Sequence, residues 1–166
     1  MDRLARLGAI SAFAAGILEI TAQIVPYVPN NPALEALYGA VDIAFLTALV
    51  AMVGVLTPRL GWAALLPLLL AIAGVASIVG PDKTAFGIDF YQLGSAVFVL
   101  ALGIAALPLL RLPDYRRPAL IWVGTAVLAL VAGASGEPAI FRTTSVALAL
   151  GFITLAPILW REGREG

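Results

Sequence analysis

Six long apolar stretches fill most of this sequence and decide what it folds into. Each is close to the roughly 20 residues that an α-helix needs to cross a bilayer. They comprise residues 7–25, 34–56, 61–79, 90–110, 119–134 and 144–160. Only 12% of the residues are charged, against about 25% in an ordinary soluble domain. The sequence therefore predicts an all-α, polytopic membrane protein with six transmembrane helices, whose main partner is the lipid bilayer.

Short connections separate the apolar stretches, so we expect residues 1–166 to form a single integral membrane domain. Prolines punctuate these connections, because a proline disfavours helical backbone in the residue before it. Thr57-Pro58 is expected to end the second helix, and Asn31-Pro32 has the residue types of a helix N-cap followed by its first turn.

The distribution of arginine and lysine predicts how the chain crosses the membrane. With a cytoplasmic N-terminus, eight of the ten basic residues lie on the cytoplasmic side and only Lys83 and Arg142 lie outside. Such an excess is typical of cytoplasmic loops. We therefore expect a multi-pass protein of the cytoplasmic (inner) membrane with both termini in the cytoplasm. The eight arginines are Arg3, Arg6, Arg59, Arg111, Arg116, Arg117, Arg161 and Arg164.

Aromatic residues gather near the same side of the membrane. Trp62, Trp122, Trp160 and Tyr115 all fall close to the expected cytoplasmic ends of their helices. Tryptophan and tyrosine are enriched at both membrane–water interfaces. We expect these four residues to form an interfacial belt.

Regular spacings suggest three helical hairpins around a pseudo-threefold axis. Phe45, Phe98 and Phe152 are 53 and 54 residues apart, and a tyrosine precedes the first two by seven residues. The odd-numbered helices share a step of small residues, at Ala15-Gly16, Ala73-Gly74 and Ala132-Gly133. Such internal repeats are common in membrane proteins. The alternative is coincidence in a chain rich in alanine, glycine and leucine.

The missing residue types exclude several kinds of chemistry. The chain has no cysteine and no histidine, which removes thiol nucleophiles, zinc sites with these ligands and histidine-ligated haem. It also lacks a phosphate-binding glycine loop and a GxSxG nucleophile motif. We expect no metal and no cofactor. Without a long basic run, nucleic acid is not an expected partner.

Two carboxylates inside the apolar stretches are the first candidates for function. A charged residue at the centre of a membrane helix costs about 2.5–3.5 kcal/mol on insertion scales and usually faces protein or water. With a rise of about 1.5 Å per residue, Glu19 and Asp42 both fall in the outer half of the membrane, on adjacent helices. The alternative is that each carboxyl group simply hydrogen-bonds a neighbouring helix.

Other polar residues share faces with these carboxylates. Gln23 follows Glu19 by four residues, and Tyr38 precedes Asp42 by four, so each pair shares one helix face. Asp89 and Gln92 lie at the outer entrance of the fourth helix. Small residues continue the Glu19 face toward the N-terminus, and small residues let helices pack closely. They are Ala5, Gly8, Ala12 and Gly16.

We therefore interpret Glu19, Gln23, Tyr38, Asp42, Asp89 and Gln92 as candidate ligand-binding residues of a polar pocket in the outer half. The favoured function is binding or transport of a small-molecule ligand, cationic or proton-coupled, without catalysis. Two alternatives stay open. One is a membrane-embedded acid/base enzyme for an isoprenoid or lipid. The other is an accessory subunit that acts with another membrane subunit. No residue is assigned a catalytic role.

Overall fold

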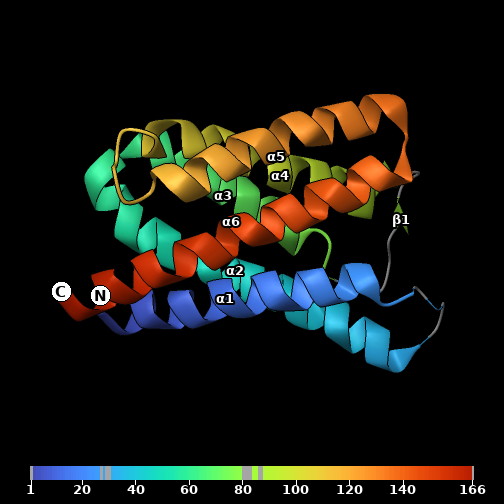
Figure 1. Ribbon diagram of the computed structural model, residues 1–166, viewed down its shortest axis with the longest axis horizontal. Coiled ribbons are helices and arrows are strands. Elements are labelled where there is room, and N and C mark those ends of the chain that lie inside the picture. Colours follow the sequence, from blue (N-terminus) through green and yellow to red (C-terminus); the bar gives the residue numbers. More distant parts are fainter. Residues whose placement is uncertain (1, 27, 29–30, 80–83, 86–87, 166) are drawn as a thin grey trace.

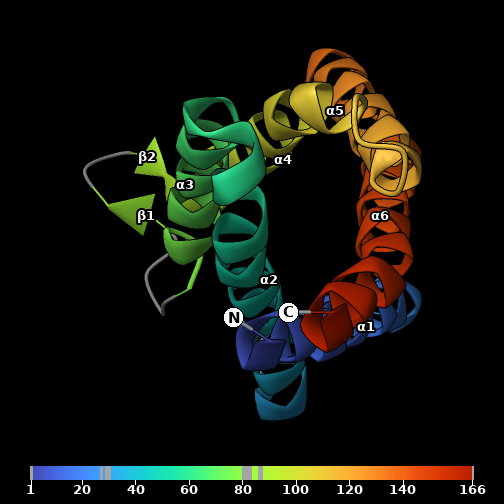
Figure 2. The ribbon, with the colours of Figure 1, turned by 90° about the vertical axis from the view of Figure 1, so that its left-hand side faces the viewer.

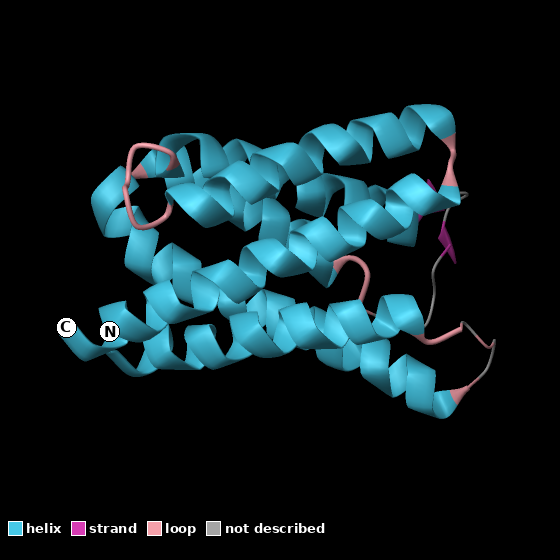
Figure 3. Cartoon of the chain, in the orientation of Figure 1, coloured by secondary structure: helices cyan, strands magenta, loops and turns pink. Residues whose placement is uncertain are grey.

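The computed structural model describes residues 2–26, 28, 31–79, 84–85 and 88–165, and nearly all of them are helical (Figure 3). The α-helices are α1 (Asp2–Ile24), α2 (Pro32–Leu60), α3 (Trp62–Ala76), α4 (Phe90–Leu109), α5 (Arg116–Ser135) and α6 (Pro138–Glu165). Two short strands, β1 (Thr84–Ala85) and β2 (Ile88–Asp89), pair antiparallel before α4. The all-α prediction is confirmed. Five helices are long and apolar enough to span a membrane, and α3 is shorter, with 15 residues.

The helices form a ring in which each packs against its neighbours in the chain. α6 closes the ring by packing against α1, and this is the most extensive contact between any two helices (Figure 2). Both termini lie at the same end of the bundle (Figure 1), which we name the terminal end. The opposite end, where α1, α3 and α5 finish, is named the distal end. A common end for both termini is what six crossings require.

The predicted end of the second helix and the predicted start of the sixth are wrong. α2 continues through Thr57-Pro58 to Leu60 instead of ending before the proline, and Gly61, at a φ of 56°, then separates it from α3. α6 begins at Pro138, six residues before the predicted start at residue 144, because proline suits a first helical turn. The hydroxyls of Thr143 and Thr144 therefore lie within α6, beyond its first turn. They donate to carbonyls one turn back, each at 2.8 Å.

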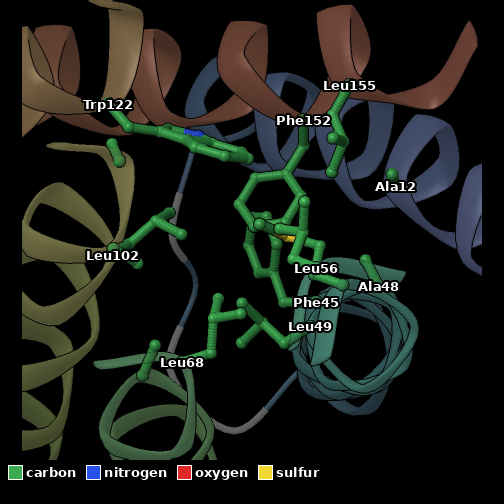
Figure 4. Packing of buried hydrophobic residues seen from close by; sticks show 14 of the residues in the cluster. Ala12, Phe45, Ala48, Leu49, Leu56, Leu68, Leu102, Trp122, Phe152 and Leu155 are labelled. Atoms are coloured by element: carbon green, nitrogen blue, oxygen red, sulfur yellow. The ribbon is translucent and has the colours of Figure 1, made fainter. Parts of the chain in front are cut away.

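The three phenylalanines that the spacing relates meet inside the ring. The ring centroid of Phe45 lies 5.4 Å from that of Phe98 and 4.7 Å from that of Phe152, and Phe98 and Phe152 are 6.3 Å apart. Trp122 of α5 adds a fourth ring, 5.1 Å from Phe152 (Figure 4). We name these four residues the aromatic layer. The aromatic layer fills the centre of the ring of helices, and each of its side chains is at most 4% exposed.

Trp122 corrects the expectation of an interfacial belt. Trp62 and Trp160 are 72% and 40% exposed and fit that role, but Trp122 is 1% exposed. Its indole packs directly on the backbone at Gly151 of α6, where any side chain would collide with it. Tyr115 is also 1% exposed. These two aromatic residues, Trp122 in α5 and Tyr115 just before it, therefore belong to the interior.

The small-residue steps have unequal roles in packing. A Cβ added at Gly16 would lie 2.8 Å from the carbonyl oxygen of Ala149 in α6, and one added at Gly74 would lie 2.6 Å from the backbone nitrogen of Phe98 in α4. A Cβ at Gly133 would meet nothing within 4 Å. Gly16 thus packs between neighbouring hairpins, at the α1–α6 contact. Gly74 packs within its own hairpin, at the α3–α4 contact, and Gly133 has no packing role. The phenylalanines follow the predicted threefold pattern, and the glycines do not.

Candidate functional site

Glu19 and Asp42 approach each other in the distal half of the bundle. Glu19 lies five residues before the end of α1, about 8 Å along the helix, and Asp42 lies ten residues into α2, about 15 Å. Both side chains are half-buried. They lie close enough for the charge of one to act on the other. The two helices therefore bring the predicted carboxylates into one layer.

Glu19 sits where α1 contacts α6. The Gln23 amide donates a hydrogen bond of 2.8 Å to Oε1 of Glu19, and the Ser145 hydroxyl of α6 is a second hydrogen-bonding neighbour of this carboxylate. One turn earlier, Gly16 packs against the backbone of α6. The close approach that Gly16 permits is what places Ser145 beside a residue of α1.

The predicted seam of small residues on α1 is buried. Ala5 and Ala12 are at most 2% exposed, and Gly8 faces Ala51 of α2 so closely that a Cβ at Gly8 would overlap it. Small residues allow helices to approach in this way. α1 is therefore held between α2 and α6, with Glu19 and Gln23 as the polar end of the packed seam.

Two tyrosines extend the polar group toward α4. Tyr91, in the first turn of α4, lies within electrostatic range of Glu19, Asp42 and Tyr38. Tyr38 is half-buried one turn before Asp42, and Tyr91 is 49% exposed. Four helices thus contribute to one group of polar side chains. We name it the carboxylate cluster, comprising Glu19, Gln23, Tyr38, Asp42, Tyr91 and Ser145.

The other two predicted residues have different surroundings. Asp89 is the N-cap of α4, where its Oδ1 accepts hydrogen bonds from the backbone nitrogens of Tyr91 at 2.9 Å and Gln92 at 3.1 Å. Its carboxylate is exposed and is engaged in capping. The Gln92 side chain is exposed, and no described contact brings it to Glu19 or Asp42. Asp89 lies within electrostatic range of Tyr91 and so borders the carboxylate cluster, whereas Gln92 stays outside it.

Tyr91 and Ser145 were missed as site residues, although the spacing of the phenylalanines contains their signal. Tyr38 and Tyr91 each precede a phenylalanine of the aromatic layer by seven residues, and Ser145 precedes Phe152 by the same interval. Seven residues are about two helical turns. The three residues therefore occupy equivalent positions of the three hairpins, in the layer above the phenylalanines.

The ion pairs seen between described residues do not involve Glu19 or Asp42. Those pairs are Arg59 with Glu162 and Arg161 with Asp114, and both lie at the terminal end. Within the same described ranges, no group of three or more acidic side chains lies together as a metal site would need.

Comparison with protein-family models, with curated proteins and with solved structures finds no match to this chain. Its class, a multi-pass helical membrane protein, therefore rests on its own residues.

Proposed function

We propose that this chain is an inner-membrane protein whose carboxylate cluster binds a small cationic solute from the outer side. The observation that carries the proposal is the approach of Glu19 and Asp42, from adjacent helices, in a partly buried layer. Two negative charges in such surroundings repel each other and are costly to desolvate. A bound positive charge offsets both costs.

The proposed orientation follows from the arginines. All eight arginines expected in the cytoplasm are exposed, and they belong to the start of α1, the end of α2, the α4–α5 connection with the start of α5, and the end of α6, which lie at the terminal end (Figure 1). Arg142 lies at the distal end, near the start of α6, and Lys83 falls outside the described residues. Because basic residues concentrate on the cytoplasmic side, the terminal end is proposed to face the cytoplasm. The carboxylate cluster then faces outward.

The tyrosines favour an organic ammonium ion as the solute. Tyr38 and Tyr91 lie within electrostatic range of each other and on the same side of the bundle as both carboxylates. Aromatic faces attract alkylammonium groups with about 0.5–2 kcal/mol. Gln23 and Ser145 already hydrogen-bond Glu19 and hold it in place. The favoured solute is therefore a primary to quaternary ammonium ion of a few carbon atoms. Its charge would face the carboxylates and its alkyl groups would face the tyrosine rings.

A calorimetric titration of the purified protein with tetramethylammonium chloride tests this proposal. We expect saturable binding and a thermal stabilisation, which reaches about 2.7 kcal/mol at a hundred times the Kd. The matched control is tert-butanol, an uncharged molecule of similar shape, with sodium chloride holding the ionic strength constant. Equal responses to the two molecules, or no saturable heat, would contradict a cation site.

A further inference from the structure

A second polar cluster closes the terminal end around Glu162 of α6. Arg59 of α2 donates two hydrogen bonds to this carboxylate, from Nη1 to Oε1 at 2.6 Å and from Nη2 to Oε2 at 2.5 Å. Tyr115, in the connection between α4 and α5, donates its hydroxyl to Oε1 at 3.3 Å. A bidentate pair of this kind is among the strong hydrogen-bonded arrangements in proteins. We name Arg59, Tyr115 and Glu162 the latch.

The latch residues continue the inner faces of their helices. On α2, steps of three or four residues lead from the aromatic layer to Arg59, and on α6 similar steps lead from the aromatic layer to Glu162. The residues between are almost fully buried. These inner faces comprise Phe45, Leu49, Met52, Leu56 and Arg59 on α2, and Phe152, Leu155, Leu159 and Glu162 on α6. The latch therefore forms the outermost layer at the terminal end, beyond the aromatic layer, with the Glu162 side chain 20% exposed and the Arg59 side chain 45% exposed.

The latch joins parts of the ring that are otherwise apart. α1 lies between α2 and α6, which scarcely touch each other directly (Figure 2). The Arg59–Glu162 pair therefore spans the space between them at the terminal end. Beside it, Nε of Arg6 in α1 donates to the carbonyl oxygen of Gly163 at 2.8 Å. Four segments of the chain meet within one residue of Glu162.

The Tyr115 hydroxyl is suited to donate its hydrogen bond to Glu162 over the whole physiological pH range. Burial raises the pKa of its hydroxyl, and the neighbouring Glu162 carboxylate raises it further, while Arg59 opposes them. The phenol consequently stays protonated at any physiological pH. The other ion pair at this end, Arg161 with Asp114, is 3.5 Å long with side chains 59% and 67% exposed, and exposed pairs of that kind contribute little. The Arg59–Glu162 pair differs in its two hydrogen bonds and in the lower exposure of its side chains, 45% and 20%.

We propose that the latch is a gate that keeps the terminal end shut and must open for a solute to leave on that side. This inference rests on the proposed function and extends it from binding to transport, because a solute carried from the carboxylate cluster to the terminal end must pass Glu162. The aromatic layer and the latch are then two successive barriers between the cluster and the proposed cytoplasmic side. Breaking the latch frees α2 from α6 without touching the cluster.

Cysteine labelling tests the gate cleanly, because the chain contains no cysteine of its own. The reporter is Leu56→Cys, one turn behind Arg59 and 0% exposed, treated with a charged maleimide in purified protein. We expect no reaction while the latch is intact. Adding Glu162→Gln or Arg59→Ala is expected to raise the labelling rate at least about tenfold, the factor that one lost charge-assisted hydrogen bond gives.

Three further variants serve as controls. Arg161→Ala removes the neighbouring exposed pair and is expected to leave Leu56→Cys unreactive. Arg111→Cys, at an exposed position, must react in every background. The reversed pair, Arg59→Glu with Glu162→Arg, is expected to restore protection, and it carries the test if a single variant fails to fold.

The gate is overturned if Leu56→Cys reacts with the latch intact, if it stays unreactive in folded latch variants, if Arg161→Ala exposes it equally, or if the reversed pair leaves it reactive. The labelling needs no ligand, so it is independent of solute binding. Absence of tetramethylammonium binding by the unaltered protein would overturn the proposed function alone. Unreactive latch variants in a protein that binds tetramethylammonium would overturn the gate alone.

Discussion

Glu19→Gln is expected to weaken tetramethylammonium binding about thirtyfold, because removing one partner of a partly buried charge pair costs about 2 kcal/mol. Glutamine keeps the length of the side chain and still offers an oxygen to the Gln23 amide, which donates to Glu19 at 2.8 Å. The packing of α1 against α6 is therefore preserved while the charge is lost. Calorimetric titration of the purified variant measures the change in Kd.

The matched control for this variant is Glu35→Gln. Glu35 is an exposed carboxylate in the first turn of α2, at the same end of the bundle but outside the carboxylate cluster. Its neutralisation is expected to change the Kd less than about twofold, since charges screened by solvent contribute little. Equal losses in the two variants would indicate diffuse attraction to the distal end, and no loss in Glu19→Gln would remove Glu19 from the site.

Gly74→Leu is expected to prevent folding of the bundle. A Cβ at Gly74 would lie 2.6 Å from the backbone nitrogen of Phe98 and 2.8 Å from the carbonyl oxygen of Gly94. Both are backbone atoms that cannot turn aside, so α3 and α4 must separate to admit any side chain. The monodisperse peak in size-exclusion chromatography and the cooperative thermal transition are expected to disappear.

Gly133→Leu provides the matched comparison. Gly133 occupies the corresponding small-residue step of α5, but a Cβ there meets nothing within 4 Å. Leucine has a better helix propensity than glycine, and the position is exposed on the outer surface of the ring. This variant is expected to fold with unchanged or slightly higher stability. Similar behaviour of the two variants would contradict the packing described for α3 and α4.

Much of the fold was predictable from hydropathy, because a membrane leaves so few alternatives to a spanning helix. The phenylalanine spacing suggested three related hairpins, and in the structure the three phenylalanines meet at the centre. The faces that helices turn toward one another were harder to predict. Trp122 is a residue type typical of interfacial anchors and lies at the expected depth in the membrane, yet it is buried against Gly151. Gly74 and Gly133 are alike in sequence and differ only in what lies opposite them.

The candidate site was only partly predictable for the same reason. Glu19 and Asp42 stand out because charge is costly in an apolar helix, and adjacency of α1 and α2 brings them together. Ser145 is an ordinary residue by sequence, and its place beside Glu19 depends on the closure of the ring by α6. Asp89 has the same chemistry as Asp42 but caps α4. Contacts between helices that are distant in sequence decide which of these residues belong to the site, and such contacts cannot be read from local sequence.

The central claim, that Glu19 and Asp42 act on one bound cation, is tested most directly by infrared difference spectroscopy. Tetramethylammonium is added to purified protein, with tert-butanol as the uncharged control, and the carboxyl bands are compared with those of Glu19→Gln and Asp42→Asn. We predict carboxyl changes on ammonium addition alone, with part of the signal missing in each variant. A spectrum without carboxyl changes, or one that neither variant alters, would contradict the account.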